Sequence, residues 1–167
     1  MATRLRTLHY VLCLAGIGLA LYSMHVELML VEIPGYTPAC DISSWAMSCS
    51  KVFTSKFAKP LSNWNIVSRG SSFDFSLPQF AIVYFMLMLI LPTVRDKMPS
   101  LVVGFRSLSY MAIAFNLYLA YILKFVLGEV CVVCVGNYFV NLGLWLTVSR
   151  ISRVETQMDV RRGRKQD

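Results

Sequence analysis

The chain has 167 residues, of which 56% are hydrophobic and only 15% are charged, whereas an ordinary soluble domain has about 45–50% apolar and about 25% charged residues. This composition excludes a disordered chain and a multidomain soluble enzyme. The net charge of +7 does not by itself indicate nucleic-acid binding, because lysine and arginine gather on the cytoplasmic side of membrane proteins. The composition predicts a small polytopic membrane protein.

Four stretches without Asp, Glu, Lys or Arg are each near the length that crosses about 30 Å of hydrocarbon. They are residues 8–26, 77–94, 107–123 and 131–149. The third can extend over 101–127 if Arg106 and Lys124 reach toward opposite membrane faces. The first stretch is long for a signal peptide, and no convincing cleavage site follows it. The predicted fold class is an all-α membrane protein with a four-transmembrane-helix bundle.

Basic residues are distributed unevenly between the two sides of this bundle. Ten of them lie in the N-terminus, in the segment 95–97 and from residue 150 onward, whereas the loop of about 32–76 has a net charge of +1. The positive-inside rule therefore places both termini in the cytoplasm and the loop on the opposite side. We predict one membrane domain over residues 1–150 and a basic cytoplasmic tail over 151–167.

The loop of about 32–76 is the one sizeable polar segment. Prolines and a Pro-Gly pair punctuate it, and its last residues are rich in turn formers. Residues 42–57 between these signals are predicted to form short helices. These helices would cap one end of the bundle.

Two of the five cysteines, Cys131 and Cys134, form a Cys-x-x-Cys pair where the last span begins. The spacing puts both sulfurs on one helical face, and a helix N-terminus favours thiolate, most strongly for Cys131 in the first turn. Cys134 lies one turn deeper, where a lipid-soluble substrate could reach it. Cys13 lies within the first span and is interpreted as a small buried hydrophobe.

A zinc half-site is the alternative interpretation of the Cys-x-x-Cys pair. Its completion would need further ligands from the loop cysteines or from the two histidines. These histidines, His9 and His25, lie at opposite ends of the first predicted span. No metal is therefore predicted.

Cys40 and Cys49 flank eight residues of the polar loop. In an oxidising compartment they could form a structural disulfide that staples the loop. The alternative is that they are the first pair of a relay that passes electrons to Cys131 and Cys134 by thiol–disulfide exchange. The Cys-x-x-Cys spacing favours redox work, and both interpretations remain open on spacing alone.

Several stretches together resemble the vitamin K epoxide reductase family, in particular its animal, membrane-only branch. They are Leu21-Tyr22-Ser23-Met24-His25-Val26-Glu27, Cys40-Asp41, Ser48-Cys49-Ser50-Lys51-Val52-Phe53, Tyr118-Leu119-Ala120-Tyr121-Ile122-Leu123, and Cys131-Val132-Val133-Cys134 followed by Tyr138. The resemblance implies a four-helix bundle in the endoplasmic reticulum membrane with a lumenal active site. It also implies reduction of vitamin K epoxide to the quinone and of the quinone to hydroquinone, without a tightly bound cofactor.

The resemblance also assigns roles to the four cysteines by matching position. Cys134 is similar to the thiolate that attacks the substrate, and Cys131 to its resolving partner. Cys40 and Cys49 match the pair that a lumenal thioredoxin-like protein reduces, and Cys49 would form the transient disulfide with Cys131. The positions that match the lining of the naphthoquinone pocket are Phe53, Phe80, Leu119, Leu123 and Tyr138.

The sequence departs from the family pattern at the start of the second span. The family has a pocket asparagine there, whereas the matching position in this chain is Leu77. An amide donor would stabilise negative charge that develops on a substrate oxygen. Gln79 could replace it if its side chain points into the pocket. The interval between Cys40 and Cys49 is also one residue longer than in vertebrate members of the family.

Two other functions are compatible with these residues. The same relay could run in the oxidative direction and form disulfides in secretory proteins, because the direction depends on the two reduction potentials. The second alternative is a non-enzymatic role as a four-span membrane scaffold with structural disulfides. The expected partners are a lipid-soluble quinone and a separate thioredoxin-like donor, with no nucleic acid, and the chain is expected to be a monomer.

Overall fold

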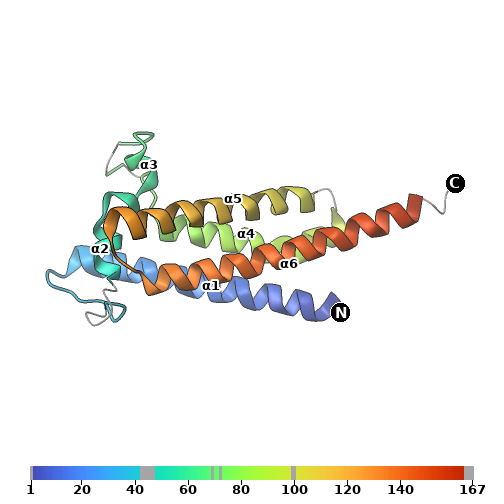
Figure 1. The fold of residues 1–167 in the computed structure, drawn as a ribbon, viewed down its shortest axis with the longest axis horizontal. Coiled ribbons are helices and arrows are strands. Elements are labelled where there is room, and N and C mark those ends of the chain that lie inside the picture. Colours follow the sequence, from blue (N-terminus) through green and yellow to red (C-terminus); the bar gives the residue numbers. More distant parts are fainter. Residues whose placement is uncertain (1, 42–47, 69, 72, 99–100, 164–167) are drawn as a thin grey trace.

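A computed structural model describes residues 2–41, 48–68, 70–71, 73–98 and 101–163. Four long helices run alongside one another: α1 (Ala2–Glu32), α4 (Leu77–Lys97), α5 (Leu101–Tyr121) and α6 (Val132–Gly163) (Figure 1). A π-helical segment, η3 (Ile122–Leu127), continues α5 as far as the left-handed Gly128. The described ranges contain no strand. The prediction of an all-α, four-helix architecture is therefore confirmed.

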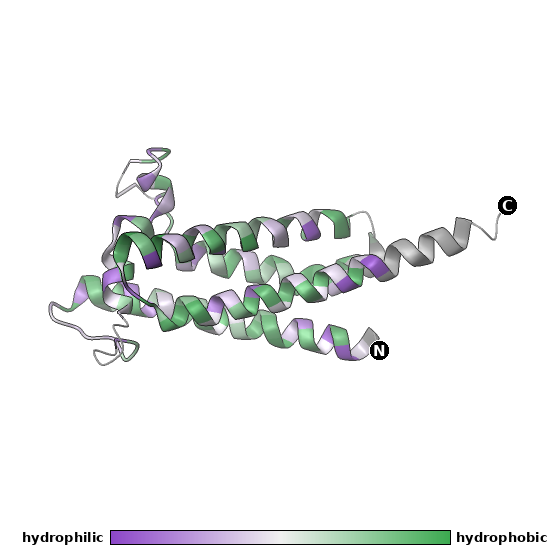
Figure 2. Ribbon diagram, in the orientation of Figure 1, coloured by the Kyte–Doolittle hydropathy of each residue, from purple (hydrophilic) through white to green (hydrophobic). Residues whose placement is uncertain are grey.

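Each long helix, with η3 counted together with α5, provides a segment that is long and apolar enough to span a membrane. These segments are Thr3–Glu32, Leu77–Val94, Leu101–Leu127 and Val132–Arg153, with mean hydropathies of 1.7, 2.0, 1.7 and 1.5. Large apolar side chains cover the outside of the bundle, and Leu14, Met111 and Phe139 are 59%, 69% and 70% exposed. Figure 2 shows hydrophobic residues along the length of the helices and hydrophilic ones near the ends. Such a surface suits lipid rather than water.

The two ends of the bundle differ in structure. The chain termini lie at one end, and three short helices gather at the other: α2 (Cys49–Thr54), η2 (Lys56–Ala58) and α3 (Pro60–Asn63) (Figure 1). These short helices confirm the helical prediction for residues 49–57, while residues 42–47 lie outside the described part of the chain. Because α6 continues to Gly163, the predicted boundary at residue 150 does not coincide with the end of a helix.

The long helices pack unevenly. α1 packs mainly against α4 and α6, and α5 packs mainly against α6. Inside α4, Pro92 has no N–H to donate to the carbonyl of Met88 one turn earlier. The Nε2 of the fully buried His9 donates to this carbonyl at 2.8 Å, and its Nδ1 lies 3.1 Å from the Thr147 hydroxyl. His9 therefore joins α1 to α4 and α6 through polar contacts.

α1 and α4 approach closely at Gly16. A Cβ atom built on Gly16 would lie 2.5 Å from two ring atoms of Phe85. The Phe85 side chain is fully buried in the core between these helices. The ring cannot move aside without disturbing its neighbours, so the contact requires glycine.

We expect Gly16→Ala to lower the free energy of unfolding by about 1–3 kcal/mol, the usual cost of overpacking a core. The measurement is thermal or denaturant unfolding of the protein in detergent. Gly18→Ala is the matched control, since a Cβ at Gly18 meets nothing within 4 Å. Equal destabilisation of the two variants would contradict the argument.

Candidate active site

The Cys-x-x-Cys pair lies where η3 ends and α6 begins. Cys131 immediately precedes α6, and its Sγ accepts a hydrogen bond of 3.2 Å from the backbone N–H of Cys134. This is the place and the hydrogen bond of an N-cap residue. The sequence placed Cys131 in the first turn, so the helix starts one residue later than predicted. Both sulfurs are free thiols; Cys131 is fully buried and Cys134 is partly buried.

The surroundings of Cys131 favour its thiolate. The pKa of the Cys131 thiol is lowered from its usual range, chiefly by a hydrogen bond from the Cys134 thiol and also by the backbone N–H groups of Cys134 and Val133. Burial and the negative charge of Asp41 oppose this shift. Because the hydrogen bonds to the sulfur prevail, Cys131 is the better poised of the two thiols for thiol–disulfide exchange.

We expect the ultraviolet absorbance of the Cys131 thiolate to appear at a lower pH than that of an ordinary thiol. A lowered pKa means that the thiolate persists as the pH falls toward neutrality. In Cys134→Ala the thiol donor is lost and only the backbone donors remain, so the titration should move to higher pH. Identical titrations of the parent and Cys134→Ala, both in a Cys13→Ala background, would contradict this explanation.

The loop pair lies beside the Cys-x-x-Cys pair. Cys40 and Cys49 form a disulfide with an S–S distance of 2.23 Å. The Sγ of Cys49 lies 3.9 Å from the Sγ of Cys131, although 82 positions separate the two residues in sequence. The prediction that Cys40 and Cys49 can pair is thus met in the structure. The distance between Cys49 and Cys131 is short enough for exchange between the two pairs after a small movement.

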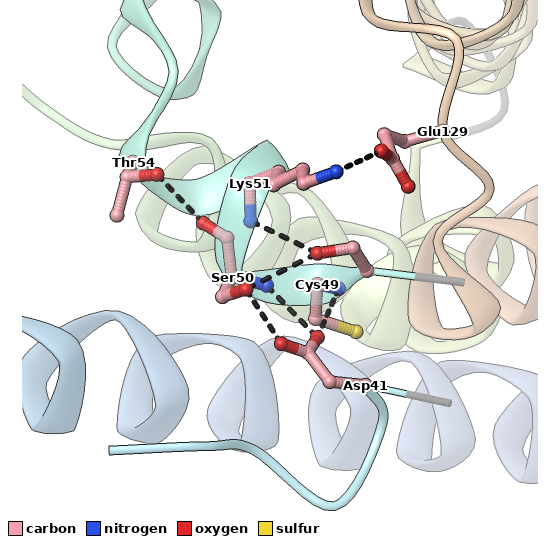
Figure 3. A network of polar contacts seen from close by, with 7 residues as sticks. Asp41, Cys49, Ser50, Lys51, Thr54 and Glu129 are labelled. Carbon is pink, nitrogen blue, oxygen red and sulfur yellow. Dashed lines mark hydrogen bonds and ion pairs between the residues drawn. The ribbon is translucent and has the colours of Figure 1, made fainter. Parts of the chain in front are cut away.

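Asp41 holds Cys49 at the start of α2 (Figure 3). One carboxylate oxygen accepts the backbone N–H of Cys49 at 2.5 Å and that of Ser50 at 3.1 Å, and the other accepts the Ser50 hydroxyl at 2.5 Å. A carboxylate at a helix N-terminus satisfies unpaired N–H groups and interacts favourably with the helix dipole. Asp41 directly follows Cys40 in the chain. Its hydrogen bonds therefore hold the segment that carries Cys40 against the start of α2, which carries Cys49.

Two further contacts attach α2 to the segment before α6. The backbone N–H of Ser48 donates to the carbonyl of Val130 at 3.0 Å. The side chains of Lys51 and Glu129 form an ion pair (Figure 3). Both contacts lie one or two residues from the neighbouring sulfurs of Cys49 and Cys131. Sequence reasoning missed Asp41, Lys51 and Glu129 as positioning residues, because no local spacing relates them to their partners.

A buried apolar cluster surrounds the sulfurs, and we call it the sulfur cluster. It contains Val26, Cys40, Cys49, Val52, Phe53, Leu123, Cys131 and Val133, with Cys134 packed against it. The structure thus brings together all four predicted redox cysteines and two of the predicted pocket residues. Such close packing keeps bulk water away from the sulfurs.

The other predicted pocket residues lie outside the sulfur cluster. Phe80 is 40% exposed and packs edge-on against Phe75, with ring centroids 6.0 Å apart. Leu119 is partly buried on α5. Tyr138 lies one turn beyond Cys134 on α6, and its hydroxyl is buried without a hydrogen-bond partner. Gln79 is exposed, and its side-chain oxygen accepts the Ser76 N–H at 2.8 Å, where it helps to cap α4.

A cavity of about 430 Å³ adjoins the sulfur cluster at Phe53. Its walls come from the end of α1, from the short helices and from the segment before α4, and they include Glu27, Lys56, Lys59 and Asp74. The Lys59 ammonium lies 3.9 Å from the Asp74 carboxylate. The cavity is thus polar at one side and apolar toward the sulfur cluster.

One group of described residues has the donor types of a metal site. The ligand atoms of Cys40, Asp41 and Cys49 all lie within 4.8 Å of one another. However, the two sulfurs are bonded to each other, whereas metal ions bind thiolates. The Asp41 oxygens are also already bonded to N–H and O–H donors. These residues therefore fit a redox pair better than a metal site.

Comparison with known proteins agrees with this geometry. The model of the Vitamin K epoxide reductase family matches residues 7–149. The chain is 35% identical over 139 residues to "Vitamin K epoxide reductase complex subunit 1" of Mus musculus, across 81% of this chain and 83% of that protein. It is also 35% identical over 143 residues to the protein of the same name from Rattus norvegicus, across 83% and 85%. With four membrane helices and two adjacent cysteine pairs, the chain belongs to the vitamin K epoxide reductase family and is a membrane oxidoreductase.

Proposed function

We propose that this protein reduces vitamin K quinone to hydroquinone and vitamin K epoxide to the quinone. Cys131 and Cys134 are the active-site dithiol, and Cys40 and Cys49 are the pair that recharges it. The observation that carries the proposal is the 3.9 Å between the sulfurs of Cys49 and Cys131. A structural disulfide needs no third and fourth sulfur beside it, whereas a relay does.

The chemical steps follow from this arrangement. Cys134 attacks the substrate, and the Cys131 thiolate then attacks the Cys134 sulfur, which forms the Cys131–Cys134 disulfide. Two electrons pass from the cysteine pair to the substrate; one proton comes from the Cys134 thiol and the second from solvent, because Cys131 reacts as the thiolate. Quinone becomes hydroquinone, and epoxide becomes quinone plus water.

The loop pair then restores the dithiol. When a thioredoxin-like protein has reduced the loop pair, Cys49 attacks the sulfur of Cys131 and releases Cys134 as a thiol. Cys40 next attacks Cys49 and releases Cys131. The products are a Cys40–Cys49 disulfide and two free thiols, which is the distribution of bonds in the described structure.

The proposed placement in the membrane follows from the difference between the two ends of the bundle. The sulfur cluster lies at the end opposite the termini, where α2 meets the start of α6. We propose an endoplasmic reticulum membrane protein with cytoplasmic termini and a lumenal active site, in line with the excess of basic residues near the termini. We further propose one domain over residues 1–150, a basic tail over 151–167, a monomeric state and no tightly bound cofactor.

The decisive experiment is turnover of both substrates by the purified full-length protein with a small dithiol. We expect quinone reduction to be the faster reaction, because the start of α4 supplies no amide donor to the pocket: Leu77 has no amide, and the exposed side chain of Gln79 is turned back to the Ser76 N–H, which its oxygen accepts. Turnover of neither substrate would contradict the proposal. If neither cysteine pair changed redox state when a quinone was added, a scaffold with structural disulfides would be favoured instead.

A further inference from the structure

Asn116 lies on the buried face of α5. The buried residues of this helix are Val102, Ser109 and Asn116, spaced seven residues apart. The same interval leads to Leu123 of η3, which belongs to the sulfur cluster. Because α5 packs mainly against α6, this face is turned toward α6. Asn116 therefore lies about two helical turns deeper in the bundle than the sulfur cluster.

The amide nitrogen of Asn116 has no hydrogen-bond partner. The residue is 8% exposed, and its Nδ2 is buried without an acceptor. Ser109, on the same face, has a satisfied hydroxyl that donates to the Arg106 carbonyl at 2.8 Å. An unpaired buried donor within a membrane span is costly, and such residues commonly mark functional sites. The Asn116 amide is thus a buried donor that no acceptor of the described residues satisfies.

The depth of Asn116 matches that of Tyr138. The rings of Tyr110 on α5 and Trp145 on α6 pack with centroids 5.9 Å apart, which sets the register of these antiparallel helices. Counting six residues from this ring contact toward the sulfur cluster leads to Asn116 on α5 and to Phe139, the neighbour of Tyr138, on α6. The Tyr138 hydroxyl is also buried without a partner. Two unpaired polar groups therefore lie at one level, about a turn below Cys134.

We propose that Asn116 is a substrate-binding residue whose amide N–H donates a hydrogen bond to one oxygen of the quinone, while the Tyr138 hydroxyl binds the other. This inference rests on the proposed function and assigns the amide donor to α5. A quinone has two acceptor oxygens on opposite sides of its ring, so two separate donors can hold it. The ring then lies within reach of Cys134.

The chemistry of reduction gives the amide a role beyond binding. When the dithiol delivers two electrons, negative charge develops on the quinone oxygens before both protons have arrived. A fixed donor in a water-poor site stabilises that charge. An amide keeps its own proton throughout, so Asn116 orients and stabilises the substrate without taking part in proton transfer.

The test compares Asn116→Leu with Ser109→Ala, a control on the same face whose hydroxyl is satisfied within its own helix. Quinone binding is measured in a Cys134→Ala background, which prevents turnover, by affinity and by the infrared carbonyl bands of bound vitamin K quinone. We expect Asn116→Leu to lose about tenfold in affinity and to shift one carbonyl band to the frequency of an unbonded carbonyl. Ser109→Ala should change neither.

Two further readouts separate the possible results. With Cys134 intact, Asn116→Leu should lower kcat/KM for quinone about tenfold, while the ligand-free protein unfolds at an equal or higher temperature because a buried unpaired group is gone. A lower unfolding temperature with unchanged carbonyl bands would make Asn116 a structural residue, with the Oδ1 of Asn141 on α6 as the acceptor because it is also buried without a partner, and would overturn the inference. If the parent protein binds and reduces quinone but Asn116→Leu keeps both bands, the inference alone fails; if the parent neither binds nor reduces quinone, the proposed function fails.

Discussion

Cys134→Ala is expected to abolish quinone reduction with every reductant, by a factor of at least about a thousand. Cys134 is the partly buried thiol of the pair, whereas Cys131 is fully buried and its Sγ accepts the Cys134 N–H. Without Cys134 the substrate has no accessible nucleophile, and no disulfide can form with Cys131. The measurement is steady-state turnover of vitamin K quinone with a small dithiol and, separately, with a thioredoxin-like protein.

Cys13→Ala is the matched control for this result. Cys13 is also a free, buried thiol in a membrane helix, but it packs in the core between the long helices rather than with the sulfur cluster. Its loss should leave turnover within about twofold, since removal of one small buried atom affects mainly packing. Full activity of Cys134→Ala would show that the proposed chemistry is wrong.

Cys40→Ala and Cys49→Ala are expected to separate the two kinds of reductant. Either change should reduce turnover with a thioredoxin-like protein about a hundredfold, because the protein donor can no longer pass electrons through the loop pair. A small membrane-permeant dithiol can reach the Cys131–Cys134 disulfide directly, so turnover with it should stay within about threefold. The comparison uses the same purified protein and quinone with each reductant.

The two loop variants should nevertheless trap different species. In Cys40→Ala, Cys49 can attack Cys131 across the 3.9 Å that separates their sulfurs, but no Cys40 remains to resolve the bond. A Cys49–Cys131 disulfide should therefore accumulate and be found by mass spectrometry of nonreduced peptides. Cys49→Ala loses the same loop disulfide without forming this bond, which makes it the control for stability. Equal loss of activity with both reductants would indicate a structural disulfide instead.

Much of the fold could be predicted from the sequence because its cause is local. Long runs of apolar residues predict spans at 8–26, 77–94, 107–123 and 131–149, and the structure has a membrane-length helix at each. The ends were less accurate: α1 extends from Ala2 to Glu32 and α6 to Gly163. Hydropathy reports where lipid begins, whereas a helix continues until its backbone meets a cap or a breaker.

The candidate site also has one part that local spacing predicted and another part that depends on contacts between distant segments. The i, i+3 spacing of Cys131 and Cys134 predicted two sulfurs on one face, and the structure places them together at the start of α6. The spacing of Cys40 and Cys49 left a structural disulfide and a relay open, and the Cys-x-x-Cys spacing of the other pair favoured the relay. Their position beside Cys131 depends on the contacts of Asp41 with α2 and of Ser48 with Val130. No local pattern encodes those contacts, since each joins segments that meet only when the bundle closes.

Composition and local pattern were enough to predict membrane helices from a chain that is 56% hydrophobic, and to assign ten of its 16 lysines and arginines to the side of the termini. Three features became visible only in the folded bundle: Cys49 lies against Cys131, His9 satisfies the carbonyl freed by Pro92, and the Asn116 amide is buried without a partner. The physical reason is the distance along the chain over which each interaction acts. Helix formation and lipid preference follow from neighbouring residues, whereas redox contact and polar pairing depend on distances between helices that are far apart in the chain.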